Sequence, residues 1–259
     1  MRSFSSWGTA LIGLWLAATA AAMAAEVDSP ALTSRPVAVD RDRVFVGRMD
    51  FRVLQNEAPA GLVSVHASFN EQGQYVLHDR SESAPLGIVE ELLQVLEADG
   101  FRPLRSLVQG RINGSFIDLN WRWHADTAAG DLESYHLASG RHRALQREVP
   151  MPTGTLTRAS ALYLIAALPL TADVPLTLNW FDSMSGSVVP IELSIEGTTT
   201  IEVPAGRFEV LTIRQRGGSP ENLIYLSTEA PARVVRFDVV GAPIRLELLP
   251  AQVTTEAVP

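Results

Sequence analysis

From residue 174 onward the chain alternates between short apolar segments and turns, without helical periodicity. Segments such as "FEVLTI" and "NLIYL" are apolar on both faces, which is typical of strands that are covered on both sides. A sheet curled around a helix or an apolar cavity would provide that cover. The predicted strands are 175–181, 187–196, 198–203, 207–216, 222–227, 232–240 and 243–249.

Period-two patterns also mark the first half of the chain, where 43–54, 61–69 and 75–83 predict an antiparallel meander. The stretch "FIDLNWRWH" alternates in the same way. One face of it carries Ile117, Leu119, Trp121 and Trp123. The other face carries Asp118, Asn120, Arg122 and His124. The first face is typical of a core or of a ligand-cavity wall, and the second of a solvated sheet surface.

Two segments predict helices. In 86–100, apolar residues recur at helical spacing, the glutamates fall on the opposite face, and Gly100 is a helix stop signal. In 156–168, Thr155 or Thr157 would cap the helix and Pro169 would end it. We therefore expect an α+β fold, mainly antiparallel β. It would be a strongly curved sheet or half-barrel with two helices packed on or across it.

The N-terminus predicts export. Arg2 is followed by an apolar, alanine-rich segment from Ala10 to Ala25, and "AMA" before Ala25 fits a signal-peptidase site. We expect residues 1–25 to be a signal peptide, 26–42 a flexible leader, 43–250 a single domain and 251–259 a tail. No second apolar run of spanning length follows, so we expect no transmembrane segment after cleavage. In a Gram-negative host the location would be the periplasm.

Composition excludes several classes of function. The net charge of −8 argues against nucleic acid as a partner, because that binding needs dense positive charge. All 21 basic residues are Arg, and the chain has no Cys. A lysine Schiff base, a Gly-Lys-Ser phosphate loop, a cysteine nucleophile, a thiolate metal site and a disulfide are therefore excluded. We also expect no cofactor.

Catalytic and metal-binding motifs are absent from the sequence. His136 and His142 are six apart, which matches no zinc spacing, so we expect no metal site. These absences favour a protein that is not an enzyme and assign no catalytic residue. The alternative is an envelope hydrolase with an unrecognised carboxylate or serine site. It requires convergence of two or more of Asp118, His124, Asp182 and Ser185.

The favoured hypothesis is non-enzymatic binding of an apolar or lipid-like ligand within the curved sheet. Aromatic side chains on the predicted strands would line the ligand cavity. A third hypothesis is a structural scaffold that binds another envelope protein through an exposed strand or patch. The predicted ligand-binding residues are Trp121, Trp123, Trp180, Phe208 and Tyr225.

Three stretches together resemble a known family: "ASALYLIAALPL", "TIEVPAGRFEVLTI" and "NLIYLSTEAPARVVRFDVVGAPIRLELL". Their order is similar to that in the exported bacterial proteins of the domain-of-unknown-function family numbered 3108. The resemblance covers about residues 43 to 250 and implies a secreted or periplasmic protein with a curved half-barrel. It transfers no catalytic residue. Within the second stretch, Pro204 and Gly206 predict a hairpin turn.

Overall fold

The computed structural model describes residue 32 and residues 35–218 and 220–251. The predicted signal peptide and residues 252–259 of the predicted tail lie outside them. The described residues form one sheet of 15 strands in the order β8-β7-β6-β5-β4-β3-β2-β1-β15-β14-β13-β12-β11-β10-β9. Strands β8 and β9 end this order, so the sheet is an open one. All its strand pairs are antiparallel except β9 with β10.

The strands come from nearly every part of the described chain. They are β1 (Gly47–Gln55), β2 (Ala58–Phe69), β3 (Tyr75–Ser83), β4 (Ile88–Leu96), β5 (Pro103–Ile112), β6 (Ser115–His124), β7 (Thr127–His136), β8 (Arg141–Pro150), β9 (Thr155–Thr157), β10 (Leu176–Asp182), β11 (Ser187–Val203), β12 (Gly206–Arg216), β13 (Asn222–Ser227), β14 (Val234–Val239) and β15 (Ile244–Leu248). The helical elements are η2 (Arg41–Arg43), α2 (Arg158–Tyr163) and η3 (Ile165–Ala167).

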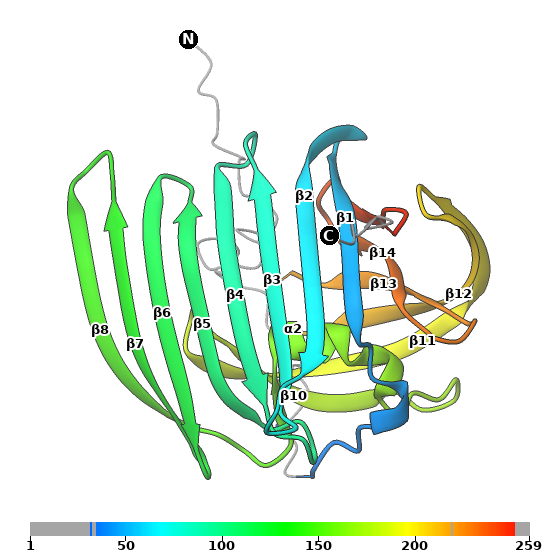
Figure 1. The fold of residues 1–259 in the computed structure, drawn as a ribbon, viewed down its shortest axis with the longest axis horizontal. Coiled ribbons are helices and arrows are strands. Elements are labelled where there is room, and N and C mark those ends of the chain that lie inside the picture. Colours follow the sequence, from blue (N-terminus) through cyan, green and yellow to red (C-terminus); the bar gives the residue numbers. More distant parts are fainter. Residues whose placement is uncertain (1–31, 33–34, 219, 252–259) are drawn as a thin grey trace, which may run out of the picture.

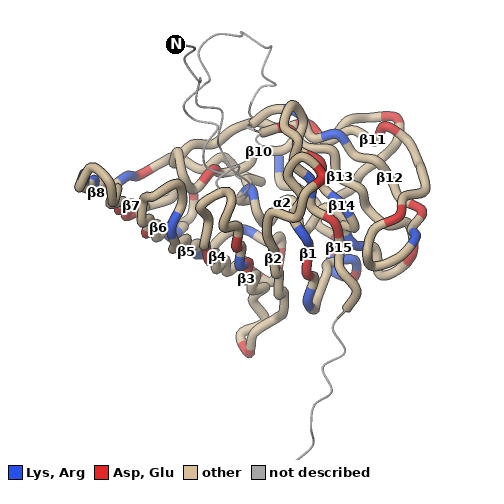
Figure 2. Tube along the Cα trace, turned by 90° about the horizontal axis from the view of Figure 1, so that it is seen from above, with Lys and Arg blue, Asp and Glu red and all other residues tan. Residues whose placement is uncertain are grey.

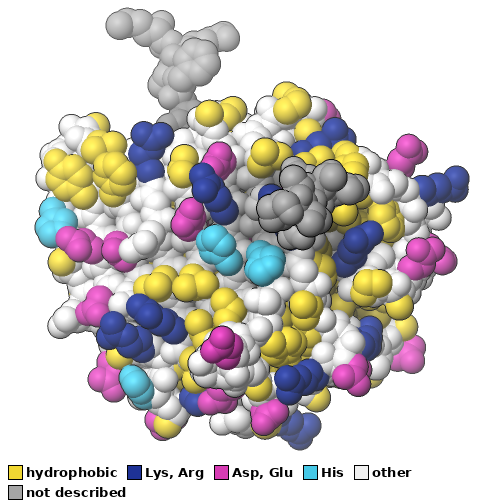
Figure 3. All heavy atoms as spheres, in the orientation of Figure 1, with side chains coloured by type: hydrophobic (Ala, Val, Ile, Leu, Met, Phe, Trp, Pro, Cys, Tyr) yellow, Lys and Arg dark blue, Asp and Glu magenta, His cyan; other side chains and the backbone are white. Residues whose placement is uncertain are grey.

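The sheet bends back on itself. Strands β1 to β8 stand side by side as one wide wall, and β10 to β13 cross behind them (Figure 1). Seen from above, the wall curves from β8 through β3 to β15, and α2 lies between the wall and β10 (Figure 2). The outward side of the wall faces the viewer in Figure 3 and mixes charged, histidine and hydrophobic side chains. The inward side faces α2 and the crossing strands.

The sequence-based α+β assignment is wrong, because the described chain is almost entirely β-sheet. The segment predicted as a helix at 86–100 contains β4, which pairs with β3 on one side and β5 on the other. Inward positions of β4 include the buried polar residues Glu90 and Gln94, while Val89 points outward and is exposed. This exchange of polar and apolar positions hides the period of two and imitates a helical pattern.

The second predicted helix is also much shorter than expected. Only Arg158–Tyr163 is α-helical, and a single 3₁₀ turn follows. Thr157 caps the helix as predicted: its hydroxyl accepts from the Ser160 amide, and the Ser160 hydroxyl accepts from the Thr157 amide. All six residues of α2 are buried. The element is thus a short plug inside the sheet, held by burial of its whole surface.

The core has two parts. The larger part lies between β1–β4, the strands β10–β15 and α2, and it includes Phe51, Tyr75 and Trp180. The smaller part lies under β5, β6 and β7 and is built around Trp121 and Phe181. Beyond this second cluster the sheet continues to β8, where nearly every side chain is exposed. The inward face of the wall is therefore filled on the β1 side and open on the β8 side.

Candidate functional site

The open part of the inward face is a groove along β6, β7 and β8. Three leucines form its middle row, because Leu119 pairs directly with Leu132 and Leu132 with Leu145. Their exposure rises toward the edge of the sheet: Leu119 is buried, Leu132 is half-buried and Leu145 is 39% exposed. Met184, in the turn between β10 and β11, also lines the groove, whose volume is about 400 Å³.

Arginines from β8 flank the leucine row. Arg147 pairs with Gly130 and Arg143 with Ser134, so both lie on the same face as Leu145. Both line the groove. Arg147 Nη1 donates to the Ser185 carbonyl at 2.7 Å, which ties β8 to the turn after β10. Within the described residues, neither arginine forms an ion pair with a carboxylate. The groove thus combines an apolar floor with a rim that carries Arg143 and Arg147, and also Glu133, which contacts His142.

A second, smaller cavity adjoins the groove and has a volume of about 50 Å³. It lies between β3, β4, β5, the start of α2 and the turn after β10. Met184 lines both this cavity and the groove. The lining is mixed, with several charged groups that are unusual so deep in a fold. The polar lining residues are Asp79, Glu90, Gln94, Arg158, Asp182 and Ser183. We call this cavity the polar pocket.

Asp79 and Glu90 place two buried carboxyl groups in the polar pocket. Asp79 Oδ2 accepts from the Tyr163 hydroxyl at 2.9 Å, and Oδ1 accepts from Ser81 at 3.1 Å. Burial raises the pKa of Asp79 to about 6, although both hydrogen bonds and His78 oppose the increase. Burial, and then the charge of Asp79, raise the pKa of Glu90 well above its usual value. Both effects favour the neutral form of Glu90.

The buried guanidinium of Arg158 supplies positive charge to the polar pocket. It lies 5.3 Å from the ring centroid of Trp180, in a cation–π arrangement. Burial lowers the pKa of Arg158 to about 10, and the nearby charge of Asp182 opposes that decrease. Arg158 is therefore charged at neutral pH, and Asp182 balances it.

The predicted ligand-binding tryptophans are core residues. Trp121 and Trp123 both pack edge-on against Phe181, with ring centroids 4.7 and 5.3 Å away. Trp121 donates its indole N–H to the Ser183 carbonyl at 2.8 Å. Trp123 lines a separate cavity of about 240 Å³, and its buried indole nitrogen has no acceptor in the described residues. Trp180 is buried beneath Arg158.

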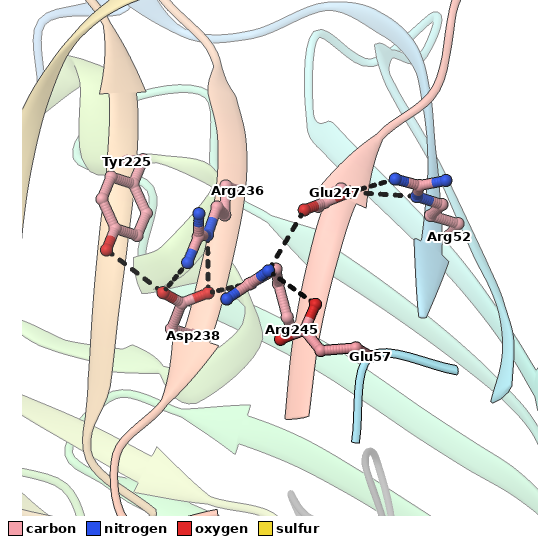
Figure 4. A network of polar contacts seen from close by, with 7 residues as sticks. All are labelled: Arg52, Glu57, Tyr225, Arg236, Asp238, Arg245 and Glu247. Carbon is pink, nitrogen blue, oxygen red and sulfur yellow. Dashed lines mark hydrogen bonds and ion pairs between the residues drawn. The ribbon is translucent and has the colours of Figure 1, made fainter. Parts of the chain in front are cut away.

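The other two predicted ligand-binding residues lie elsewhere. Phe208, in β12, is half-buried and lies 5.7 Å from the Arg233 guanidinium. Tyr225 belongs to a polar network that crosses β1, β13, β14 and β15 (Figure 4). Its hydroxyl donates to Asp238 Oδ2 at 3.1 Å, and Asp238 also binds Arg236 and Arg245. The five predicted residues are therefore spread over both core clusters and the polar network, and none of them is in the lining of the groove. Ligand contact by them stays a prediction.

Of the four residues of the hydrolase hypothesis, the structure brings two together and places the other two apart from them. Asp118 and His124 are exposed on the outward face of β6, opposite the face that carries Trp121. Asp182 and Ser185 do approach each other, with 3.0 Å between Oδ2 and Oγ. Asp182 Oδ1 also accepts from the Met184 amide, so this contact is side-chain capping of a turn.

Sequence reasoning missed Glu90, because it assigned this residue to the polar face of a helix. One signal was present. Reading 88–96 at period two places Glu90 and Gln94 in line with Ile88 and Leu96, which marks two polar groups on an apolar face. Part of the groove lining was predictable from the sequence, since Ile117 and Leu119 belong to the predicted apolar face of 116–124. Its contributions from β7, β8 and the turn at Met184 depend on tertiary structure.

Comparison with known proteins establishes the class of fold. The chain resembles a solved structure described as a beta-barrel-like protein of domain of unknown function DUF1849 from Brucella abortus. The TM-score is 0.50 with 10% sequence identity, over 80% of this chain and 98% of that one. At that identity the likeness concerns the fold alone. No family model and no curated protein matches the chain.

Two further properties bear on the site. The described part of the chain contains no helix long and apolar enough to cross a membrane. Over the same residues, no cluster of three or more His, Cys, Asp or Glu is placed to hold a metal ion. The described chain is a barrel-like, open and mainly antiparallel β-sheet with a groove and a polar pocket on its inward face.

Proposed function

We propose that this protein is a non-enzymatic binding protein that holds an apolar or lipid-like ligand in the groove along β6, β7 and β8. The observation that carries the proposal is the leucine row on an inward sheet face. Leu145 is 39% exposed there, and Leu132 is half-buried. Covering such apolar area stabilises a complex by about 25 cal/mol per Å². The groove volume of about 400 Å³ falls in the range of roughly 300–1,000 Å³ that ligand sites occupy.

The arginines at the rim of the groove favour an amphipathic ligand. Arg143 and Arg147 flank the leucines and have no carboxylate partner in the described chain, so they can meet an anionic head group while the apolar part covers Leu145. We further propose that the protein acts in the cell envelope after export. This rests on the N-terminal apolar segment and on the resemblance to the exported family numbered 3108.

A fluorescent long-chain fatty acid tests this function by titration into the purified mature protein. We expect saturable binding near one equivalent, and Leu145→Asp should weaken it at least tenfold. Leu62→Asp is the matched control, because Leu62 is 53% exposed on the outward face of β2. Equal binding by both variants would place the ligand elsewhere, and absence of saturable binding would remove the proposal.

A second function, a scaffold for another envelope protein, is favoured by β8. Within the described chain β8 ends the sheet, and an unpaired edge can add a strand from a partner. Most of its side chains are exposed. Pull-down from an envelope extract separates the two functions. Replacing Gln146 in β8 with Pro should abolish capture of a protein partner by an added strand, while groove binding of the fatty acid should persist.

A further inference from the structure

The polar pocket has a shortage of positive charge. Arg158 is the cation that lines it, and Asp182 already offsets the charge of Arg158. Of the charged groups that line the pocket, this leaves the carboxyl groups of Asp79 and Glu90 without a compensating positive charge. Among the described residues neither forms an ion pair with an arginine or a histidine. Two buried carboxyl groups without a cation are costly when ionised, so this site needs either a proton or a bound positive group.

Glu90 carries the unused binding capacity. The residue is 5% exposed, it lines the polar pocket, and its Oε2 atom has no hydrogen-bond partner in the described chain. Buried polar atoms in native proteins nearly always have a partner. On the β5 side, Glu90 pairs with Gly110, where the two backbones are so close that a Cβ atom on Gly110 would lie 2.7 Å from the Glu90 Cα. Space for a small polar group is therefore provided by the polar pocket itself, which Glu90 lines.

The charged and titratable groups around Glu90 are few. Asp79 lies on β3, Arg158 and Tyr163 on α2, and Asp182 at the end of β10. Asp79 is tied by Tyr163 and Ser81, but a carboxylate has further lone pairs to offer. The pocket thus presents oxygen acceptors from two strands, Asp79 from β3 and Glu90 from β4.

We propose that the polar pocket is a second binding site, which takes a primary ammonium group between Asp79 and Glu90. An ammonium carries one positive charge and three N–H donors, which match the missing cation and the unused acceptor. The volume of about 50 Å³ suits a group of that size with a water molecule or two. A metal ion fits less well, because no metal-binding cluster of three or more ligands occurs in the described residues.

Binding at this site should be coupled to proton release. Burial, and then the charge of Asp79, raise the pKa of Glu90, whereas a bound ammonium group would favour its ionised form. Each cation that binds to the protonated form then releases one proton. By linkage, the affinity should rise about tenfold for each pH unit over the range in which free Glu90 is protonated.

Calorimetric titration with ethylammonium tests the site, at pH 6, 7 and 8 and in buffers of different ionisation enthalpy. We expect one-to-one binding, release of about one proton, and an affinity that increases with pH. Glu90→Gln should weaken binding at least tenfold and should remove the pH dependence between pH 7 and 8, where Asp79, with a pKa of about 6, is already largely ionised. Glu91→Gln is the matched control, because Glu91 points outward on the same strand. Thermal melts confirm that each variant is folded.

Two other probes complete the test. Ethanol has a similar size without charge, and tetramethylammonium has the charge without N–H donors, so neither should bind. Absence of ethylammonium binding, binding without proton release, or equal binding of tetramethylammonium would each overturn the proposal. The site does not depend on the groove ligand, because ethylammonium is too short to cover the leucine row. Leu145→Asp should therefore leave ethylammonium binding unchanged.

Discussion

The hydroxyl of Tyr163 in α2 donates a hydrogen bond of 2.9 Å to Asp79 Oδ2 in β3. The two residues are 84 positions apart, and both are buried. This bond joins the helical plug to the wall of the sheet at the edge of the polar pocket. It also satisfies a carboxyl group that would otherwise keep only Ser81 as its hydrogen-bond donor among the described side chains. Together with the burial of α2, this contact fixes the helix beside the pocket.

Tyr163→Phe should lower the free energy of unfolding by about 1–3 kcal/mol, because a buried acceptor loses its donor. Urea denaturation measures the change. Tyr225→Phe is the matched control: it removes an equivalent hydroxyl from Asp238, which keeps Arg236 and Arg245 as partners. The control should lose less stability. Equal losses in the two variants would show that the buried Tyr163–Asp79 hydrogen bond contributes no more to stability than the Tyr225–Asp238 hydrogen bond.

Asp79 should make the protein less stable as pH rises from 4 to 7. Burial raises its pKa from 3.8 to about 6, so the folded state holds the proton more tightly than the unfolded chain. The stabilising contribution is complete below pH 4 and is lost as pH rises through about 6. The total difference is about 3 kcal/mol.

Urea denaturation of Asp79→Asn across this pH range isolates the effect. The variant cannot ionise at this position, so its unfolding free energy should fall less between pH 4 and pH 7 than that of the unaltered protein. The difference between the two proteins should develop mainly between pH 4 and pH 6. Parallel pH profiles would mean that Asp79 titrates normally in the folded state.

Gly130→Ala should destabilise the smaller core cluster by about 1–3 kcal/mol. Gly130 pairs with Trp121, and a Cβ atom at this position would lie 2.4 Å from the indole ring. The indole must then move, which breaks its hydrogen bond to the Ser183 carbonyl and disturbs the turn that borders the groove. Fatty-acid binding should weaken as well.

Thermal unfolding and the fatty-acid titration together measure this effect. The control is Ala129→Ser, which changes the neighbouring residue on the exposed, outward face of β7. It should match the unaltered protein in both experiments. An unchanged melting temperature for Gly130→Ala would contradict the tight contact with Trp121.

The sequence predicted the second half of the sheet well, because local alternation and turn chemistry suffice there. The predicted strands from 175 to 249 all correspond to observed strands, with 187–196 and 198–203 joined as β11. The turn at Pro204 and Gly206 is a hairpin, in which Val203 pairs with Gly206, whose φ is +130°. The period-two pattern did not identify β4 as a strand, because Glu90 and Gln94 face inward and Val89 faces outward.

The candidate site was much less predictable. The polar pocket brings together Asp79, Glu90 and Tyr163 from three separate elements, and only the folded chain sets their spacing. The Arg147 contact to the turn at Ser185 is equally non-local. The aromatic residues chosen from sequence were large and apolar, but most of them fill the core. The groove instead uses smaller side chains near the open edge, such as Leu145.

The central claim, that the groove along β6, β7 and β8 holds one apolar ligand, is tested most directly by native mass spectrometry. The mature protein, stripped of bound lipid, would be mixed with a long-chain fatty acid. We predict a one-to-one adduct that Leu145→Asp removes and Leu62→Asp retains. A ligand-free mass for the unaltered protein, or the same adduct in both variants, would contradict the claim.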